Sequence, residues 1–265
     1  MFLFRESHSN SSTAPIQRIF FFGSSSMQLL QYTHPTAAGN LAIDEALLDY
    51  AEANEDHPEL LRLWEPRQTI VVLGRSSPVD IETNRSYCDE NEIEIIRRCS
   101  GGQTIVTGPG CLMYAVLLDY RRRPELRMLD RAHEFVIGKM KAAIQTLGIP
   151  VEMKGTSDLT FQGQKFSGNA LRCKRNWLIY HGTLLCNFDL SLIAKCLGKP
   201  IREPDYREGR SHMDFLTQLP TTSRNLSEAI VSQWRPELQT KTWPQDLTNQ
   251  LMQTKYQQDQ WNFKI

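Results

Sequence analysis

The segment from Arg97 to Gln103 combines two arginines with two adjacent glycines directly after a strand-like run. Glycines let backbone N–H groups approach an anion closely. Arginines beside them can neutralise a phosphate group and bind it through a fork of N–H donors. The spacing of a Walker loop, GxxxxGK followed by Ser or Thr, is absent. The segment is a candidate phosphate-binding turn, and the alternative is an ordinary hairpin turn with surface arginines.

A second cluster lies between Gly155 and Ala170, where a turn containing Asp158 precedes a strand that begins at Lys165. The Asp158 carboxylate could hold Mg²⁺, which prefers oxygen ligands. The neighbours of Lys165 are small, so its amine could reach a ligand carboxylate or phosphate without steric crowding. The alternative is an Asp in an Asx-turn beside a solvated lysine.

A third candidate is His181, in the sequence His-Gly-Thr-Leu-Leu. The charge of histidine changes near neutral pH, which suits it to acid–base chemistry. Chemistry alone nevertheless favours a structural role here, because lone histidines are more often structural or solvated than catalytic.

Hydrophobic periodicity predicts the elements that must position these residues. Apolar residues at helical spacing predict helices at 38–54, 129–147, 189–197, 225–234 and 244–254. Alternating or β-branched runs predict strands at 61–64, 69–73, 93–97, 103–106, 111–118, 158–161, 165–172 and 177–187. Residues 201–220 are polar and are predicted to be rich in loops. Strands come in groups with helices between them, which favours a mixed α+β domain with a largely antiparallel sheet flanked by helices.

The chain has 265 residues, enough for one substantial domain, and its 30 Lys plus Arg balance its 30 Asp plus Glu. A neutral balance gives no reason to expect nucleic-acid binding. No apolar run approaches the roughly 20 residues that cross a bilayer, so no membrane association is expected. The six cysteines lack CxxC pairing, as is typical of reduced thiols in a cytosolic protein. We therefore expect a cytoplasmic protein whose Ser-rich residues 1–26 form a flexible extension.

Taken in order, these segments resemble the catalytic domain of lipoate–protein ligases, whose relatives include biotin–protein ligases and octanoyltransferases. The resemblance covers about residues 28–220. Its motifs run from Asn40 to Leu48, Leu61 to Pro66, Val71 to Ser76, Arg97 to Gly102, Ser157 to Leu159, Lys165 to Ala170 and His181 to Leu185. It implies a biotin/lipoate-ligase-like, class II synthetase-like catalytic domain at 27–222. The implied remainder is a helical tail at 223–265 without an accessory domain.

The resemblance also implies a reaction. Lipoate, or octanoate, attacks the α-phosphate of ATP to give an acyl-adenylate, and a lysine of a lipoyl domain then attacks this mixed anhydride. Both steps build negative charge on oxygen, so fixed cations and backbone N–H groups should dominate catalysis. The implied acceptors are lipoyl domains of 2-oxoacid dehydrogenase E2 subunits and the glycine cleavage H protein.

Roles of the family's site residues carry over to matching positions. Lys165 is the implied catalytic residue and would bridge the acyl carbonyl and the α-phosphate. The nucleotide would be held by Arg98, Ser100, Gly101, Gly102, Gln103, Thr104, Ile105, Val106 and Asp158. Asp158 would also be the carboxylate that faces Mg²⁺. The acyl substrate would contact Arg75, Lys165, Ser167, Gly168, His181 and Thr183.

Departures from the family pattern occur mainly among the segments that the resemblance assigns to nucleotide binding. Gln103 stands at the third glycine of the usual SGGG loop, Ser157 replaces a frequent Asn, and the segment from Thr107 to Gly110 replaces a frequent His-Asp pair. The segment after Thr221 is also too short for the small C-terminal domain that many ligases carry.

Two alternatives therefore stay open. Octanoyltransferases of this superfamily are single-domain and use a cysteine thioester without ATP. Cys196 lies loosely near the required position, although its place on a short helix favours a packing role. The other alternative is a non-catalytic lipoyl- or adenylate-binding protein. The run Arg121-Arg122-Arg123 is expected to be solvated, with docking of acidic lipoyl domains as the other interpretation.

Overall fold

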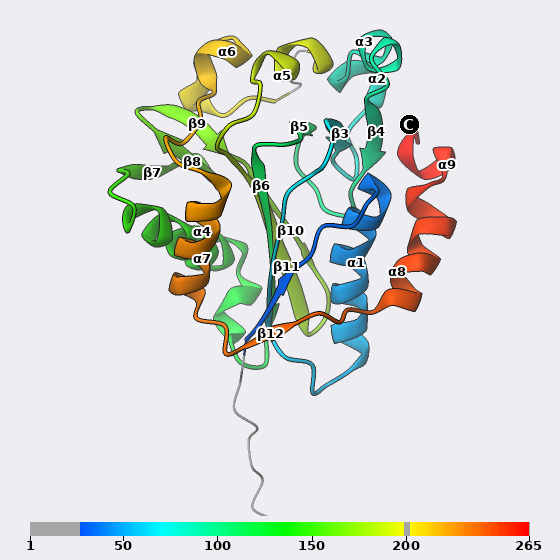
Figure 1. Cartoon of the computed structure of the whole chain (residues 1–265), viewed down its shortest axis with the longest axis vertical. Coiled ribbons are helices and arrows are strands. Elements are labelled where there is room, and N and C mark those ends of the chain that lie inside the picture. Colours follow the sequence, from blue (N-terminus) through cyan, green and yellow to red (C-terminus); the bar gives the residue numbers. More distant parts are fainter. Residues whose placement is uncertain (1–26, 199–201, 265) are drawn as a thin grey trace, which may run out of the picture.

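A six-stranded sheet forms the centre of the molecule, as the computed structural model of residues 27–198 and 202–264 describes it (Figure 1). Its strands follow the order β10, β11, β6, β2, β1 and β12. Their bounds are Asn169–Cys173, Trp177–Leu185, Cys111–Asp119, Leu60–Trp64, Gln28–Gln31 and Leu238–Thr240. The pairs from β10 to β2 are antiparallel, and β1 is parallel to both β2 and β12.

Two smaller sheets contain the remaining strands. One has the order β4 (Glu94–Arg97), β3 (Ile70–Leu73) and β5 (Ile105–Thr107), with β3 parallel to β4 and antiparallel to β5. The other is antiparallel, with the order β7 (Val151–Lys154), β8 (Asp158–Phe161) and β9 (Gln164–Ser167). Both lie in the upper half of Figure 1.

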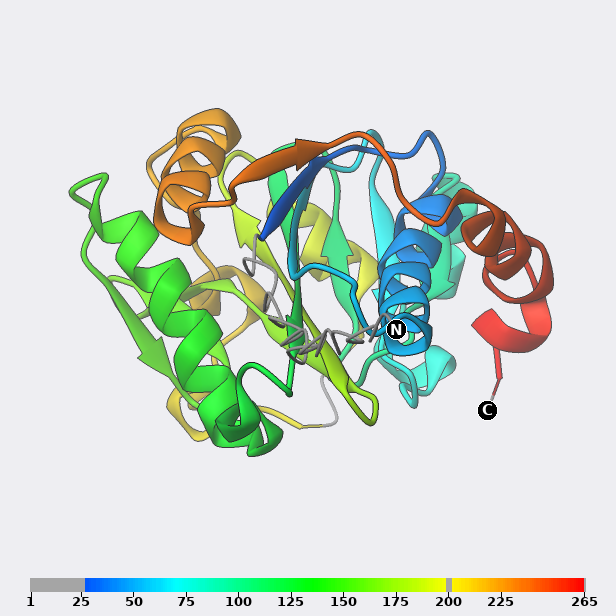
Figure 2. The same cartoon turned by 90° about the horizontal axis from the view of Figure 1, so that it is seen from below.

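Long helices cover the central sheet on two sides (Figure 2). α1 (Ala37–Ala53) and α8 (Gln245–Leu251) pack together on one side, and α4 (Leu129–Gln145) and α7 (Ser223–Trp234) on the other. The short helices are α2 (Val79–Glu82), α3 (Arg85–Glu90), α5 (Ser191–Cys196), α6 (His212–Phe215) and α9 (Asp259–Asn262), with turns η1 (Pro124–Arg127), η2 (Asp205–Arg207) and η3 (Met252–Tyr256). None of the helices within the described ranges is long and apolar enough to cross a membrane.

The predicted α+β class with a largely antiparallel sheet is confirmed. The long helices and strands lie within a few residues of their predicted bounds. The predicted strand 165–172 is instead two strands, β9 and β10, which separate at Gly168 and belong to different sheets. The predictions missed β1, β7 and β12, which have three or four residues each.

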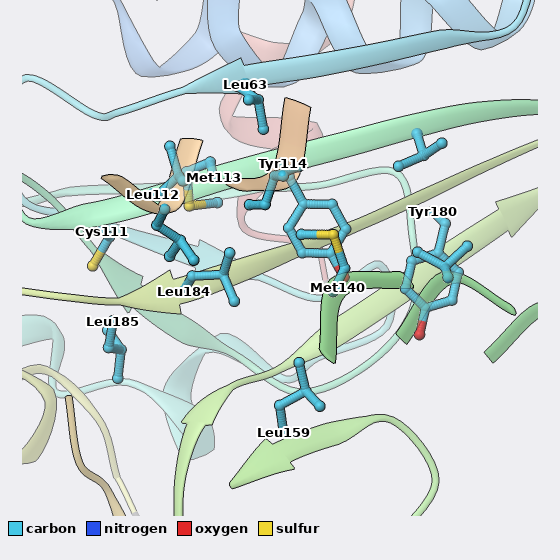
Figure 3. Close-up of a cluster of buried hydrophobic side chains, with 14 of the residues drawn as sticks. Leu63, Cys111, Leu112, Met113, Tyr114, Met140, Leu159, Tyr180, Leu184 and Leu185 are labelled. Atoms are coloured by element: carbon cyan, nitrogen blue, oxygen red, sulfur yellow. The ribbon is translucent and has the colours of Figure 1, made fainter. Parts of the chain in front are cut away.

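The core beneath α4 explains why this helix forms (Figure 3). Ala132, Val136, Met140 and Ala143 recur at helical spacing, and all four are fully buried. Met140 belongs to the same buried cluster as side chains of β6 and β11, and the indole N–H of Trp234 on α7 contacts its sulfur at 3.4 Å. One stripe of α4 therefore joins the helix to both the sheet and α7.

Residues 223–264, predicted as a helical tail, also extend the central sheet. α7 packs on α4, β12 pairs with β1, and α8 returns along α1. The tail is thus packed against both sides of the domain. The extension predicted at residues 1–26 lies outside the described residues.

Met140→Ala should lower the free energy of unfolding by about 2–5 kcal/mol, because it leaves a cavity in a fully buried cluster. Met128 is the matched control, since it immediately precedes α4 and is 63% exposed. Met128→Ala should change stability by no more than about 0.5 kcal/mol. Urea unfolding followed by circular dichroism measures both, and equal effects would contradict this account of the core.

Candidate functional site

Two adjoining cavities open beside the Ser-Gly-Gly loop that joins β4 to β5. The larger has a volume of about 290 Å³ and the smaller about 110 Å³. The residues that border both are Gln103, Thr104, Ile105, Lys165, Gly168, Thr183 and Pro204. The rest of the larger wall includes Leu41, Asp44, Trp64, Tyr114, Asp158 and His181. The rest of the smaller wall is mainly apolar and includes Val106, Phe166, Leu185, Ile193, Leu197 and Phe215.

Lys165 stands where the two cavities meet. Its Nζ lies 2.8 Å from Asp158 Oδ1, and the Tyr206 hydroxyl donates to Asp158 Oδ2 at 2.7 Å. The adjacent antiparallel strands β8 and β9 carry the carboxylate and the amine. A Cβ atom at Gly168 would lie 3.2 Å from both Cε and Nζ of Lys165, so the glycine leaves room for the amine. The result is a positioned cation between the cavities.

The Arg98 guanidinium is buried inside the Ser-Gly-Gly loop. Its Nη2 donates to the carbonyl oxygens of Gly101 and Gln103 at 2.6 and 2.9 Å, and Nη1 donates to Val72 O at 3.1 Å. Nε donates to Ser100 Oγ and to Gly101 O, each at 3.1 Å. Burial lowers the pKa of Arg98 to about 10, so the group stays protonated at neutral pH. Its hydrogen bonds therefore organise the loop from within.

A chain of hydrogen bonds fixes His181 in the wall of the larger cavity. Ser100 Oγ lies 2.6 Å from Nε2, and Asp44 Oδ2 lies 3.2 Å from Nδ1. With the ring proton on Nδ1, the imidazole donates to Asp44 and accepts from Ser100. This order matches a nucleophilic triad, but Ser100 is 1% exposed and borders neither cavity. The chain consequently orients the histidine ring and does not present a serine nucleophile.

Asp44 links this chain to a buried cation. Arg62 Nη1 lies 2.5 Å from Asp44 Oδ1, and the arginine side chain is fully buried. Burial alone would raise the pKa of Asp44, but the charge of Arg62 and the hydrogen bond from His181 outweigh it and hold that pKa below its ordinary value. The carboxylate is therefore ionised at neutral pH and keeps both partners in place.

The comparison with protein families bears directly on this arrangement. The model of the lipoyl protein ligase A/B catalytic domain matches residues 36–233, more than half of the chain. The chain belongs to the lipoyl protein ligase A/B family. The family predicted from the motifs is thereby confirmed.

Curated relatives of this ligase-family chain include both a ligase and a transferase. The chain is 28% identical over 158 residues to the probable lipoate-protein ligase A of Mycoplasma pneumoniae, a match that covers 60% of this chain and 45% of that protein. It is 25% identical over 215 residues to octanoyltransferase LipM of Oceanobacillus iheyensis, over 75% of this chain and 77% of that protein. The chain thus spans about half the length of the first relative.

Solved structures share the fold over nearly the whole ligase-family chain. A bipartite lipoate protein ligase from Thermoplasma acidophilum, described with its E2 lipoyl domain, gives a TM-score of 0.77 at 16% identity, covering 91% of this chain and 97% of that one. A lipoate-protein ligase A bound with ATP gives a TM-score of 0.70 at 18% identity, and the match covers 91% of this chain and 99% of that one. At these identities the likeness establishes a common fold.

The structure brings most of the predicted site residues to the cavities. Those that border one or both are Arg98, Gly102, Gln103, Thr104, Ile105, Val106, Asp158, Lys165, Ser167, Gly168, His181 and Thr183. Ser100 lies behind the wall, and Gly101 is exposed in the loop. The exposed Arg75 borders neither cavity, and its backbone supports the loop, since its N–H donates to Ser100 O at 2.8 Å and its carbonyl accepts from Arg97 Nη1 at 3.4 Å.

Three carboxylate or hydroxyl groups of the site had no role assigned from the sequence. Asp44 orients His181, Tyr206 holds Asp158, and Glu82 Oε2 accepts from the N–H and hydroxyl of Thr104 at 2.9 and 2.5 Å. Asp44 carried a usable signal, because it is a charged residue among apolar ones on α1. The other two lie in α2 and η2, which are too short to show a hydrophobic pattern.

The carboxylate predicted to face a metal ion is Asp158, and protein groups already engage both of its oxygens. Across the described ranges, no group of three His, Cys, Asp or Glu residues could hold a metal ion. A Mg²⁺ ion bound to nucleotide phosphates needs only one or two protein carboxylates. Asp158 is therefore compatible with a nucleotide-borne ion and does not form a protein-only metal site.

The cysteines are poorly placed for covalent catalysis. Cys196 is fully buried at the end of α5, and burial raises its pKa to about 12. In the part of the chain that the structure describes, no cysteine borders either cavity. The thiolate is the nucleophilic form, so a buried thiol with a raised pKa is unreactive.

The run Arg121-Arg122-Arg123 pairs with two buried carboxylates. Arg121 and Arg122 approach Asp119 at 2.9 and 3.8 Å, and Arg123 approaches Glu59 at 2.9 Å. Both acidic side chains are 2% exposed. The three arginines hold a strand end in place and stay partly exposed, and their docking role stays a prediction.

Asp44→Asn should destabilise the fold by about 3 kcal/mol at pH 7, because it removes the counter-ion of a fully buried arginine. Since the folded-state pKa of Asp44 lies below its unfolded value of 3.8, this contribution is complete above that value and is lost as the pH falls through the folded pKa. The difference in the free energy of unfolding between wild type and Asp44→Asn should therefore decrease as the pH falls.

The matched control is Asp49→Asn on the same helix. Asp49 pairs with Lys174 at 2.6 Å but is 28% exposed, so its loss should cost less than about 1 kcal/mol. Urea unfolding at pH 7 and pH 3 separates the two positions. Equal losses of unfolding free energy in the two variants at pH 7 would show that the buried Asp44–Arg62 pair stabilises the fold no more than the exposed pair does.

Proposed function

We propose that this protein is an ATP-dependent lipoate–protein ligase that activates lipoate, or octanoate, as an acyl-adenylate and transfers it to a lysine of a lipoyl domain. The observation that carries the proposal is the position of Lys165 at the junction of two cavities. A reaction that joins an acyl group to a nucleotide needs a cation where the two substrates meet.

The first step forms a bond between an oxygen of the acyl carboxylate and the α-phosphorus of ATP, and pyrophosphate leaves. Lys165 Nζ would contact the carboxylate and the α-phosphate together, which reduces their repulsion and stabilises the charge that develops on phosphorus-bound oxygen. In the second step the acceptor amine attacks the acyl carbonyl and AMP leaves. The same ammonium would stabilise the oxyanion. Asp158 and Gly168 keep the amine in place for both steps.

The sizes of the cavities suggest which substrate part each would hold. The larger cavity, at about 290 Å³, approaches the roughly 300 Å³ at which ligand pockets begin, and Leu41, Trp64 and Met113 give it apolar walls. It would take the acyl chain. The smaller cavity, at about 110 Å³, has apolar walls suited to a nucleoside ring. Backbone N–H groups of the Ser-Gly-Gly loop would face the phosphates between them, and Asp158 would be the carboxylate nearest a nucleotide-borne Mg²⁺.

The competing function is acyl transfer through a cysteine thioester, and the similarity to octanoyltransferase LipM favours it. The site favours the ligase. Cys196 is fully buried and the pKa of its thiol is raised. The loop from Gly155 to Asp158, where one branch of the octanoyltransferases resembled here carries its cysteine, contains none. The likeness in fold to an ATP-bound lipoate-protein ligase A also supports the ligase.

The acceptors that we propose are lipoyl domains, as in the E2 subunits of 2-oxoacid dehydrogenases and the glycine cleavage H protein. Membership of the lipoyl protein ligase A/B family supports this class of partner. The Thermoplasma ligase was described with such an E2 lipoyl domain.

Lys165→Ala should reduce lipoate-dependent exchange of labelled pyrophosphate into ATP by about 10²–10³-fold, because it removes the cation at the site of developing charge. Lys141→Ala on α4 is the control, since Lys141 borders neither cavity. Circular dichroism checks that both variants fold. More than half of wild-type activity in Lys165→Ala would exclude the proposed role.

Cys196→Ser should leave this exchange nearly unchanged, because the activated acyl group resides on AMP and not on a thiol. The parallel assay offers octanoyl carrier protein without ATP and measures octanoylation of a lipoyl domain by mass spectrometry. If wild type shows no pyrophosphate exchange and Cys196→Ser loses carrier-dependent transfer, the ligase proposal is wrong and the transferase function is supported.

A further inference from the structure

Arg97 is fully buried, yet no carboxylate within the described residues pairs with it. Its guanidinium donates instead to main-chain carbonyl oxygens of two separate segments. One segment is the turn after β3, and the other is the end of the C-terminal tail. Burying a cation in this way costs several kcal/mol unless its donors are satisfied, so both segments must stay in place around it.

On one side Arg97 supports the turn at 74–77. Its Nη1 donates to Gly74 O and Ser77 O, each at 2.8 Å. This turn touches the Ser-Gly-Gly loop, because a Cβ atom at Gly74 would fall 1.8 Å from Gly102 O. The N–H of Arg75 also donates to Ser100 O at 2.8 Å. The position of this turn therefore determines the position of the loop.

On the other side Arg97 joins the tail. Nε donates to Trp261 O and Asn262 O at 3.1 and 3.2 Å, and Nη2 donates to Lys264 O at 3.1 Å. Side chains of the tail return the contact, since Asn262 Oδ1 accepts from Arg97 N–H at 3.0 Å and the Trp261 indole donates to Arg97 O at 2.9 Å. β4 is an edge strand, and the tail satisfies the backbone groups that an edge leaves unpaired.

A second anchor fixes the same tail to α1. Lys255 Nζ and the Tyr256 hydroxyl each lie 2.7 Å from Glu45 Oε2, and Arg172 Nη1 lies 2.7 Å from Glu45 Oε1. Burial alone would raise the pKa of Glu45, but the hydrogen bonds and charge of these partners outweigh it and lower that pKa. Arg172 of β10 also reaches Cys99 O at 3.5 Å, so this anchor ends beside the loop as well.

We propose that the C-terminal segment 252–264 positions the Ser-Gly-Gly loop for ligand binding, with Arg97 as the positioning residue that connects them. No residue of this segment borders either cavity, so its effect is on where the loop lies and not on contact with a ligand. The segment also falls after residue 233, where the family match ends. The proposal rests on the proposed function only in taking this loop as part of the ligand site.

Asn262→Ala tests the connection, because it removes the acceptor for Arg97 N–H and the donor to Tyr256 O. Of these, only the bond to Arg97 N–H joins the tail to β4. Loss of one buried hydrogen bond corresponds to about a tenfold change in a local opening equilibrium. Amide hydrogen exchange of residues 98–106 should therefore accelerate about tenfold, while exchange in α4 stays unchanged. The KM for ATP in pyrophosphate exchange should rise with little change in kcat.

Three further variants make the test specific. Gln260→Ala, at an exposed position of α9, should behave as wild type. Asn262→Asp keeps an oxygen for Arg97 N–H and should restore most of the loop protection. Trp261→Phe removes the indole donor to Arg97 O, keeps an aromatic ring beside Lys255 and Lys264, and serves if Asn262→Ala does not fold. Reduced stability with unchanged loop exchange would leave the tail a merely structural element and overturn the proposal. Absence of pyrophosphate exchange in wild type would instead refute the ligase and leave the hydrogen-exchange test intact.

Discussion

Three of the four buried arginines of the described residues, Arg62, Arg97 and Arg98, determine how the backbone around the Ser-Gly-Gly loop can fold. Each guanidinium carries five N–H donors in a fixed planar fork, and each donor left without a partner in the interior is costly. Arg62 donates from Nη1 and Nη2 to Asp44 and to oxygens of the α1 segment, while its Nε has no partner among the described residues. The other two guanidinium groups donate mainly to main-chain carbonyls. Irregular turns that have no ladder of their own are therefore held by a cation at their centre.

This use of arginine separates structure from chemistry in the site. The donors of Arg98 are committed to the loop, so a ligand that approached it would have to compete with carbonyl groups of the protein. Lys165 differs, because it is a compact charge on a flexible stem with a single carboxylate partner and 25% of its side chain exposed. Its ammonium has three N–H donors, so it can bind a ligand phosphate or carboxylate while it keeps its contact with Asp158. The rigid cations define the cavity, and the adaptable cation serves the substrate.

The sequence predicts two kinds of feature well: elements with long local patterns, and site residues whose type alone suggests their chemistry. α4 shows a clear helical period, β6 and β11 are long apolar runs, and the glycine, lysine and histidine motifs identify most of the cavity wall. The partners of the buried arginines were not predictable in this way, because a carbonyl oxygen belongs to every residue and leaves no trace in composition. The same holds for Tyr206, whose contact with Asp158 depends on the path of a polar loop. Arg98 borders the larger cavity and its hydrogen bonds organise the loop, while its predicted phosphate contact stays a prediction.

The Arg97-Arg98 pair shows how one dipeptide can serve two regions at once. Successive side chains at a strand end point to opposite faces. Arg97 accordingly reaches the C-terminal tail and the turn at 74–77, while Arg98 fills the interior of the Ser-Gly-Gly loop. A shift of β4 by one residue against β3 would exchange these environments and leave both forks without their carbonyls. The register of a four-residue strand is therefore tied to the geometry of the loop, and the docked tail, which bonds the backbone of Arg97 on the free edge, holds that register.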